Sequence, residues 1–144
     1  MAYDYLEDSA VSDAGFEASG RTAVELFEQC WEATLKLMIA NPSAIREQTE
    51  NRLECSSDSL EMLLFDMLGE LLYYKDADAT LLRLVALDIR EEWSGYRLTA
   101  TARGEKINAQ RHALGVDIKA VTLHQFKVEQ TADGGFSARV VLDT

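Results

Sequence analysis

Residues 60–89 read LEMLLFDMLGELLYYKDADATLLRLVALDI, and the spacing of their apolar side chains changes half-way along. The first part places its apolar residues on one helical face, at Leu60, Leu63, Leu64, Met67, Leu68, Leu71 and Leu72. We expect the polar residues 75–78 to form a loop. Beyond it the period changes to two, which is typical of a strand with one shared face at Arg83, Val85, Leu87 and Ile89. The stretch therefore predicts a helix followed by a strand.

A second helix is predicted before this one. Thr22 with Glu25 forms the capping-box pattern of a helix start, and Asp58 with Glu61 does the same for the later helix. The pair at 41–42, Asn-Pro, ends the first helix, because proline disfavours a helical residue before it.

The other segments alternate as strands do. Residues 81–103 form one predicted hairpin and residues 118–143 another, turned at the Asp-Gly-Gly of residues 133–135. Residues 16–20 and 44–56 are predicted short strands, and the acidic residues 1–12 are expected to be mobile. We therefore predict an α+β fold, with two helices packed on one face of a mostly antiparallel sheet.

Length and charge limit the class of protein. With 144 residues, of which 47% are hydrophobic, the chain is expected to form one domain, residues 1–144, with a core that needs no disulfide. Its net charge of −11 is spread along the chain and repels phosphate backbones. Tight direct binding of nucleic acid is therefore not expected, whereas docking on a basic protein is.

Two cysteines, Cys30 and Cys55, lie in segments with apolar neighbours, so we expect reduced core thiols rather than a zinc site. No apolar run approaches the roughly 20 residues of a membrane span, and the first residues lack a signal-peptide pattern. We expect a cytoplasmic protein.

Hard-oxygen donors gather at the end of the last predicted strand. Asp143 and Thr144 follow an apolar run and offer carboxylate and main-chain oxygens, which suit Ca²⁺ or Mg²⁺ better than Zn²⁺. Asp13 lies in a small-residue loop, and the pattern alone favours an ordinary helix- or turn-capping aspartate. For Asp143 the alternative to a metal ligand is an exposed chain end.

Three nitrogen-bearing side chains are the candidate cofactor-binding residues: Lys119, His112 and His124. Lys119 lies beside apolar residues at a strand start and needs a carboxylate partner, or else extends to water. His124 alternates onto the face of Phe126, which favours a core or edge histidine. His112 lies in a loop and serves either recognition or loop capping. No nucleophile–base set accompanies them.

Three ordered segments together resemble the archease family. Residues 111–124 read RHALGVDIKAVTLH and are similar to its R-H-x-L-G-x-x-x-K-A-V-T-x-H segment, and the family also closes on Asp plus one residue. Residues 12–20 resemble its A-D-x-G segment, and residues 63–73 its L-x-x-W-L-N-E-L-L-Y helix. The chain departs from the family at Ala10 and Val11, where the family has His-Thr.

The resemblance implies a function and a site. Archeases assist the GTP-dependent tRNA-splicing RNA ligase by promoting its guanylylation and turnover, and they have no catalysis of their own. The resemblance implies a divalent metal ion at Asp13, Asp143 and Thr144, with Lys119 as a functional neighbour. Ca²⁺ is the expected ion, and Mg²⁺ and Mn²⁺ are the alternatives. A chaperone-like modulator of nucleic-acid enzymes and a small metal-dependent enzyme are the alternatives.

Overall fold

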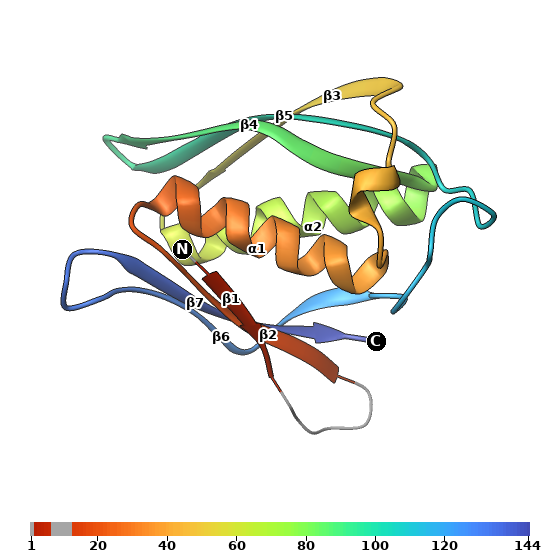
Figure 1. The fold of residues 1–144 in the computed structure, drawn as a ribbon. Coiled ribbons are helices and arrows are strands. Elements are labelled where there is room, and N and C mark those ends of the chain that lie inside the picture. Colours follow the sequence, from red (N-terminus) through yellow and green to blue (C-terminus); the bar gives the residue numbers. More distant parts are fainter. Residues whose placement is uncertain (1, 7–12) are drawn as a thin grey trace.

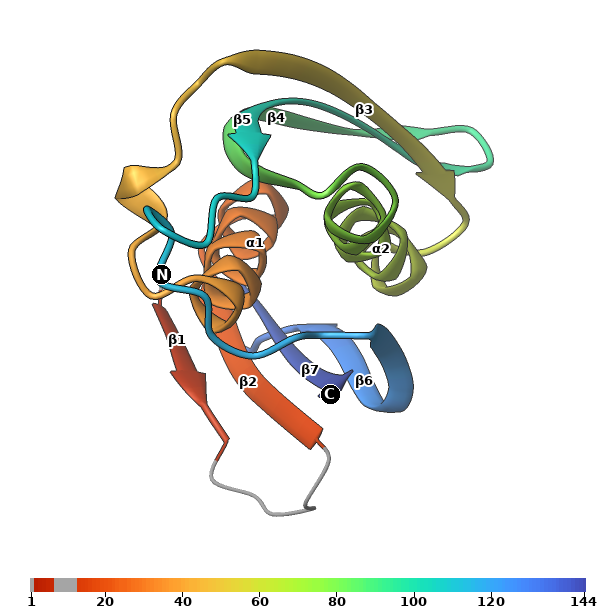
Figure 2. The same cartoon turned by 90° about the vertical axis from the view of Figure 1, so that its right-hand side faces the viewer.

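Two helices lie between two antiparallel sheets (Figures 1 and 2). The computed structural model describes residues 2–6 and 13–144. The helices are α1, Ala23–Met38, and α2, Leu60–Asp78, and a short 3-10 turn, η1, spans Pro42–Ala44. The predicted α+β class is confirmed.

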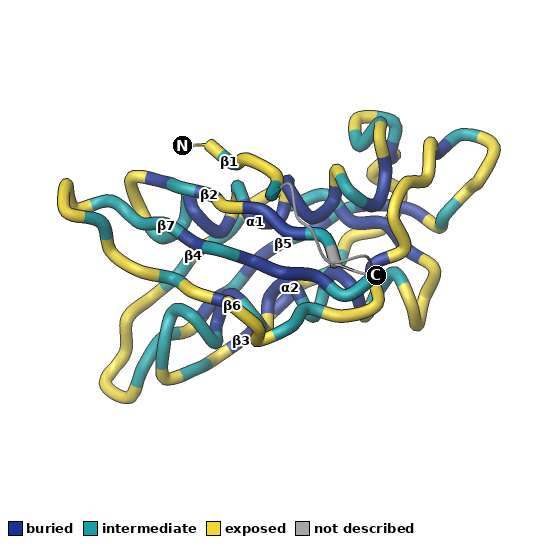
Figure 3. The backbone as a smooth tube through the Cα atoms, turned by 90° about the horizontal axis from the view of Figure 1, so that it is seen from below, coloured by how far each residue is buried: buried dark blue, intermediate teal, exposed yellow. Residues whose placement is uncertain are grey.

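The strands divide into two sheets where the sequence suggested one. The four-stranded sheet has the order β1 (Ala2–Tyr5), β2 (Asp13–Gly20), β7 (Phe136–Asp143), β6 (Ala120–Gln130). The three-stranded sheet has the order β3 (Thr49–Ser57), β5 (Gly95–Lys106), β4 (Thr80–Glu92). The two helices separate these sheets, and each sheet packs one face against them. The buried core therefore lies in the helix layer and on the inner faces of both sheets (Figure 3).

Helix α1 begins where the capping pattern predicts. The Thr22 hydroxyl accepts a hydrogen bond from the Glu25 backbone N–H over 3.1 Å. The Glu25 carboxylate in turn accepts from the backbone N–H of Arg21 over 2.9 Å, one residue earlier than in a full capping box. The helix ends at Met38, before the Asn-Pro pair. Its buried Trp31 donates its indole N–H to the carbonyl oxygen of Leu82 over 3.1 Å and so ties α1 to β4.

Helix α2 departs from its predicted limits at both ends. Its cap is Ser59 rather than Asp58, because the Ser59 hydroxyl accepts the Met62 N–H over 3.1 Å. The predicted loop at residues 75–78 is wrong, since the helix runs to Asp78 and stops where Ala79 adopts a φ of 49°. Lys75 in this last turn has partners on a distant segment, which the local sequence does not reveal.

A bulge in β4 overturns the predicted strand face. The register with β5 shifts between Leu84 and Ala86, so Val85 is 45% exposed. Leu84 packs on the core before the bulge, and Leu87 packs on it after the bulge. The extra residue changes the phase of the alternation, and Arg83 and Val85 do not share the inner face of Leu87.

Strand limits also differ from the predicted ones. Residues 2–5, expected to be mobile, pair with β2, and the Tyr5 hydroxyl donates to the Ala33 carbonyl over 2.8 Å. Strand β2 starts at Asp13 rather than at residue 16, and β3 starts at Thr49 rather than at residue 44. Cys30 and Cys55 are free and buried, as expected. No helix in the described part of the chain is both long and apolar enough to cross a membrane.

Candidate functional site

The end of β7 lies between two neighbouring strands of the four-stranded sheet. Asp143 is the register partner of Asp13 in β2 and of Ala120 in β6. The backbone N–H of Lys119 donates a hydrogen bond to the Asp143 carbonyl oxygen over 2.8 Å. Strand pairing thus gathers the backbones of Asp13, Lys119 and Asp143, with Thr144 directly after them.

This strand end is open to solvent. Asp143 and Thr144 are half-buried, and Lys119 is exposed. Asp143 is the last residue of a paired strand, so the alternative interpretation as a freely exposed chain end is wrong. An exposed ammonium group next to a half-buried acidic strand end is accessible to an anionic ligand or a partner protein.

Lys75 fixes the segment that leads to Lys119. Its Nζ atom donates to Asp117 Oδ1 over 2.9 Å and also to the carbonyl oxygen of Ile118, and it lies 2.8 Å from Asp76 Oδ1. Burial alone would lower the pKa of Lys75, but these hydrogen bonds with Asp76 and Asp117 raise it. The hydrogen bond from Lys75 and the nearby positive charges lower the pKa of Asp117. Lys75 and Asp117 therefore both stay charged at neutral pH.

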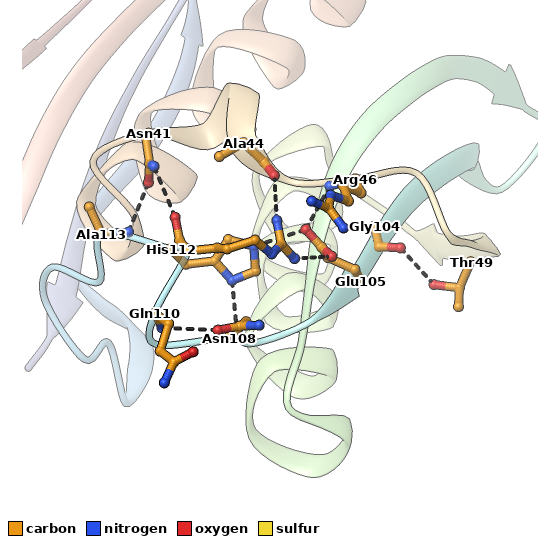
Figure 4. Close-up of polar contacts among 11 residues, drawn as sticks. Asn41, Ala44, Arg46, Thr49, Gly104, Glu105, Asn108, Gln110, His112 and Ala113 are labelled. Atoms are coloured by element: carbon orange, nitrogen blue, oxygen red, sulfur yellow. Dashed lines mark hydrogen bonds and ion pairs between the residues drawn. The ribbon is translucent and has the colours of Figure 1, made fainter.

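A buried ionic cluster holds the loop that precedes Asp117 (Figure 4). Glu105 at the end of β5 is 3% exposed and accepts the Arg46 backbone N–H over 2.7 Å. Its Oε2 lies 2.9 Å from His112 Nε2, and its other oxygen pairs with the Arg111 guanidinium. His112 Nδ1 accepts the Asn108 N–H over 2.9 Å, so Nε2 carries the proton toward Glu105. Burial would raise the pKa of Glu105, but the bonds from Arg46, Arg111 and His112 lower it to about 2.

The loop is also bonded to the end of α1. The Asn41 side-chain oxygen accepts the Ala113 N–H over 2.9 Å, and the Gly115 N–H donates to the Met38 carbonyl over 2.9 Å. A Cβ atom on Gly115 would lie 2.5 Å from the Leu37 carbonyl oxygen, so this contact requires glycine. Residues 104–119 are thus attached in turn to β5, α1 and α2, and Lys119 is held at the end of β7.

The two histidines have different environments. His112 is 2% exposed and its ring is fully engaged with Glu105 and Asn108. His124 is exposed, because the β6–β7 register is interrupted between Thr122 and Lys127 and Gln125 adopts a φ of 54°. The expected regular alternation of His124 with Phe126 is therefore wrong.

The donors at the strand end fit a hard cation by chemistry. Asp13 and Asp143 are acidic, and Thr144 adds oxygen atoms, which are the ligands of Ca²⁺, Mg²⁺ and Mn²⁺. The described side chains, those of residues 2–6 and 14–144, include no group of three or more His, Cys, Asp or Glu suited to a metal ion. A cation here would take its remaining oxygens from main-chain groups, water or a partner. The positions of the family His-Thr, Ala10 and Val11, lie outside the described residues.

Two residues of the site were not foreseen. Glu105 falls on the outward phase of β5, whose alternate residues from Leu98 to Gly104 are buried, so the pattern predicts exposure. It is buried because residues 46 and 111–112 fold over it. Lys75 falls in residues 75–78, which the sequence pattern predicts to be a polar loop rather than the last turn of a helix. The adjacent Arg111 and His112 indicate in the sequence that an acidic partner lies nearby, but they do not show that this partner is Glu105.

Comparison with known proteins identifies the relatives. The family model described as the archease protein family matches residues 3–144. A protein named archease from Methanosarcina mazei is 39% identical over 142 residues, covering 98% of this chain and 94% of that protein. The archease of Pyrococcus abyssi is 30% identical over 141 residues, covering 98% and 97%.

Two solved structures share the fold. The solution structure of a Methanobacterium thermoautotrophicum protein has a TM-score of 0.83 and 33% identity, covering 99% of this chain and 98% of that one. A crystal structure from Thermotoga maritima, described as an archease and possible chaperone, has a TM-score of 0.65 at 23% identity, covering 96% of each chain. The second likeness concerns the fold alone.

Proposed function

The chain belongs to the archease family, and on that premise we propose that it activates a GTP-dependent tRNA-splicing RNA ligase in the cytoplasm. It promotes the guanylylation and turnover of the ligase and has no catalytic activity of its own. Residues 1–144 act together as one archease-like domain.

The strand-end register supports this proposal most directly. Asp13 and Asp143 are opposed in the β2–β7 pair, and Lys119 is bonded to Asp143 through its backbone. In the proposed function, Asp13, Asp143 and the Thr144 main chain hold a divalent cation, Ca²⁺ in the first place. A bound cation of this kind supplies positive charge to phosphate oxygens.

Lys119 and the histidines have separate proposed roles. The exposed Lys119 ammonium group binds phosphate oxygens of the nucleotide as a point charge. His124, also exposed, is a second nucleotide or ligase contact. His112 acts indirectly, because its hydrogen bond to Glu105 orients the loop that ends at Lys119.

A guanylylation assay tests the proposal. The ligase from the same organism is incubated with labelled GTP, with and without this protein, and the covalent ligase–guanylate product is measured. We expect clear stimulation by the wild type and none by Lys119→Ala. Lys127→Ala is the control, because Lys127 is an exposed lysine of β6, the strand that Lys119 directly precedes. Equal stimulation by both variants would remove Lys119 from the mechanism, and no stimulation by the wild type would overturn the proposal.

A chaperone-like role is the second candidate. The Thermotoga maritima relative is described as a possible chaperone, and this chain exposes large apolar side chains, with Trp93 fully exposed and Leu123 62% exposed. Such side chains can contact apolar surface on an unfolded protein. Light scattering of a heated client enzyme would test this role, and suppression lost in Trp93→Ser would favour it over ligase activation.

A further inference from the structure

Helix α2 has an uncovered face beside the edge strand β3. Strand β3 is an outer strand of the three-stranded sheet, and α2 lies below it (Figure 2). Between them is a cavity of about 370 Å³, lined among others by Glu54, Asp66, Gly69, Glu70 and Tyr73. We call this cavity the α2–β3 groove. Its volume is ample for one long side chain.

The charged side chains that line the groove are all acidic. Glu54 comes from β3 and is paired with the Arg97 guanidinium over 2.9 Å, whereas Asp66 and Glu70 come from α2. Among the described residues, no lysine or arginine lines the groove itself. Asp66 and Glu70 are four residues apart on one helix, an arrangement of like charges that destabilises a helix. Burial raises the pKa of Cys55 to about 11, and the charges of Glu70 and Asp66 add to the rise. The negative field of these carboxylates therefore extends into the groove.

Gly69 leaves an opening in the middle of this face. A Cβ atom at Gly69 would meet no atom within 4 Å, so packing within the chain does not require glycine there. Glycine in a helix interior destabilises the helix relative to alanine. The opening gives a second chain close access to the helix backbone.

Aromatic side chains flank the opening. Tyr73 is 59% exposed, one turn from Gly69. Phe65 lines the other end and packs edge-on to Phe126 of β6, with ring centroids 5.6 Å apart. Carboxylates next to an exposed aromatic ring suit a guanidinium group, which stacks on the ring and pairs with carboxylates.

We propose that the α2–β3 groove docks an extended, arginine-bearing segment of a protein partner. The arginine side chain lies over Gly69 between Tyr73 and the carboxylates of Asp66 and Glu70. The segment runs along β3, since an edge strand offers unpaired backbone groups to an added strand. This docking surface is made by other residues than the strand-end site and does not depend on a metal or on the identity of the partner.

A peptide titration tests the groove. A synthetic peptide with arginines at alternate positions is titrated into the full chain at about 0.15 M salt, where long-range attraction is screened. The same peptide with citrulline, which has the same shape without the charge, is the ligand control. Affinity is measured by calorimetry, and the bound residues are identified from backbone amide NMR shifts.

Two matched variants separate local binding from net charge. Asp66→Asn with Glu70→Gln is compared with Glu28→Gln and Glu32→Gln, an exposed acidic pair with the same spacing on α1. We expect the α2 variant to bind at least tenfold more weakly and the α1 variant to stay within twofold of wild type. Gly69→Gln should weaken binding with no fall in melting temperature, which excludes misfolding as the cause. Equal losses in both double variants, or equal binding of the citrulline peptide, would overturn the proposal.

Discussion

Asp13 and Asp143 stand directly opposite one another in the antiparallel pairing of β2 with β7, although they come from the two ends of the chain. Like charges at opposed positions of a strand pair are destabilising. Asp143 also accepts the backbone N–H of Lys119, so its main chain is fixed from the other side. The arrangement is one that a bound cation would stabilise.

Asp143→Asn is expected to weaken Ca²⁺ binding at least tenfold, or by about 1.4 kcal/mol or more, because it removes one anionic ligand. Calorimetric titration of both proteins with Ca²⁺ measures the change. Asp88→Asn is the control, because Asp88 is an exposed aspartate of β4. Equal affinity in wild type and Asp143→Asn would exclude Asp143 from the site.

Lys119→Ala is expected to cost about 1 kcal/mol of stability or less, because this side chain is exposed and only its backbone bonds to Asp143. Lys75→Ala should cost more, about 1–3 kcal/mol, since it leaves the Ile118 carbonyl oxygen without its donor. Urea unfolding of both variants compares them. A larger loss for Lys119→Ala would mean that Lys119 has a structural role.

Glu105→Gln is expected to change how stability depends on pH. The pKa of Glu105 falls from an ordinary 4.5 to about 2 in the folded chain, so between these values the unfolded chain binds more protons. Its contribution is complete above about pH 4.5 and is lost as the pH falls to about 2. The variant should therefore be less stable at pH 7 but should lose less stability on acidification through this range. Parallel curves from urea unfolding at a series of pH values would contradict this assignment.

The sequence predicted the fold well where local signals sufficed. The apolar stripe and the Thr22 cap located α1, and alternation located both hairpins. It failed where a distant contact decides the structure. The last turn of α2 depends on Lys75 reaching Asp117, and β1 depends on pairing with β2 and on the Tyr5 bond to α1.

The candidate site shows the same difference between local signals and distant contacts. The family resemblance suggested Asp13, Lys119 and Asp143 as site residues, and this assignment stays a prediction. No spacing in the sequence predicts that Asp13 pairs with Asp143, because strand register is a tertiary property. Glu105 was missed because the predicted strand ends at residue 103, and because residues 46 and 111–112, which bury it, come from other segments.

Gly115→Ala is expected to destabilise the fold by roughly 1–3 kcal/mol, because a Cβ atom there would lie 2.5 Å from the Leu37 carbonyl oxygen. Gly69→Ala is the matched control, since its Cβ would meet no atom within 4 Å, and it should be neutral or stabilising. Thermal unfolding of the two variants measures the difference. A Gly115→Ala protein as stable as wild type would mean that the loop shifts without cost.

The protein is expected to act through a protein partner and to bind tRNA weakly by itself. Its net charge of −11 opposes the counterion release that drives binding to phosphate backbones. Association with a basic ligase should weaken as salt rises, because screening limits charge attraction to about 8 Å near physiological ionic strength. Gel shifts with tRNA, and ligase pull-downs over a salt series, measure the two effects. Tight binding of tRNA by the protein alone near physiological salt would instead require a basic surface, and the role of protein-directed activator would have to be abandoned.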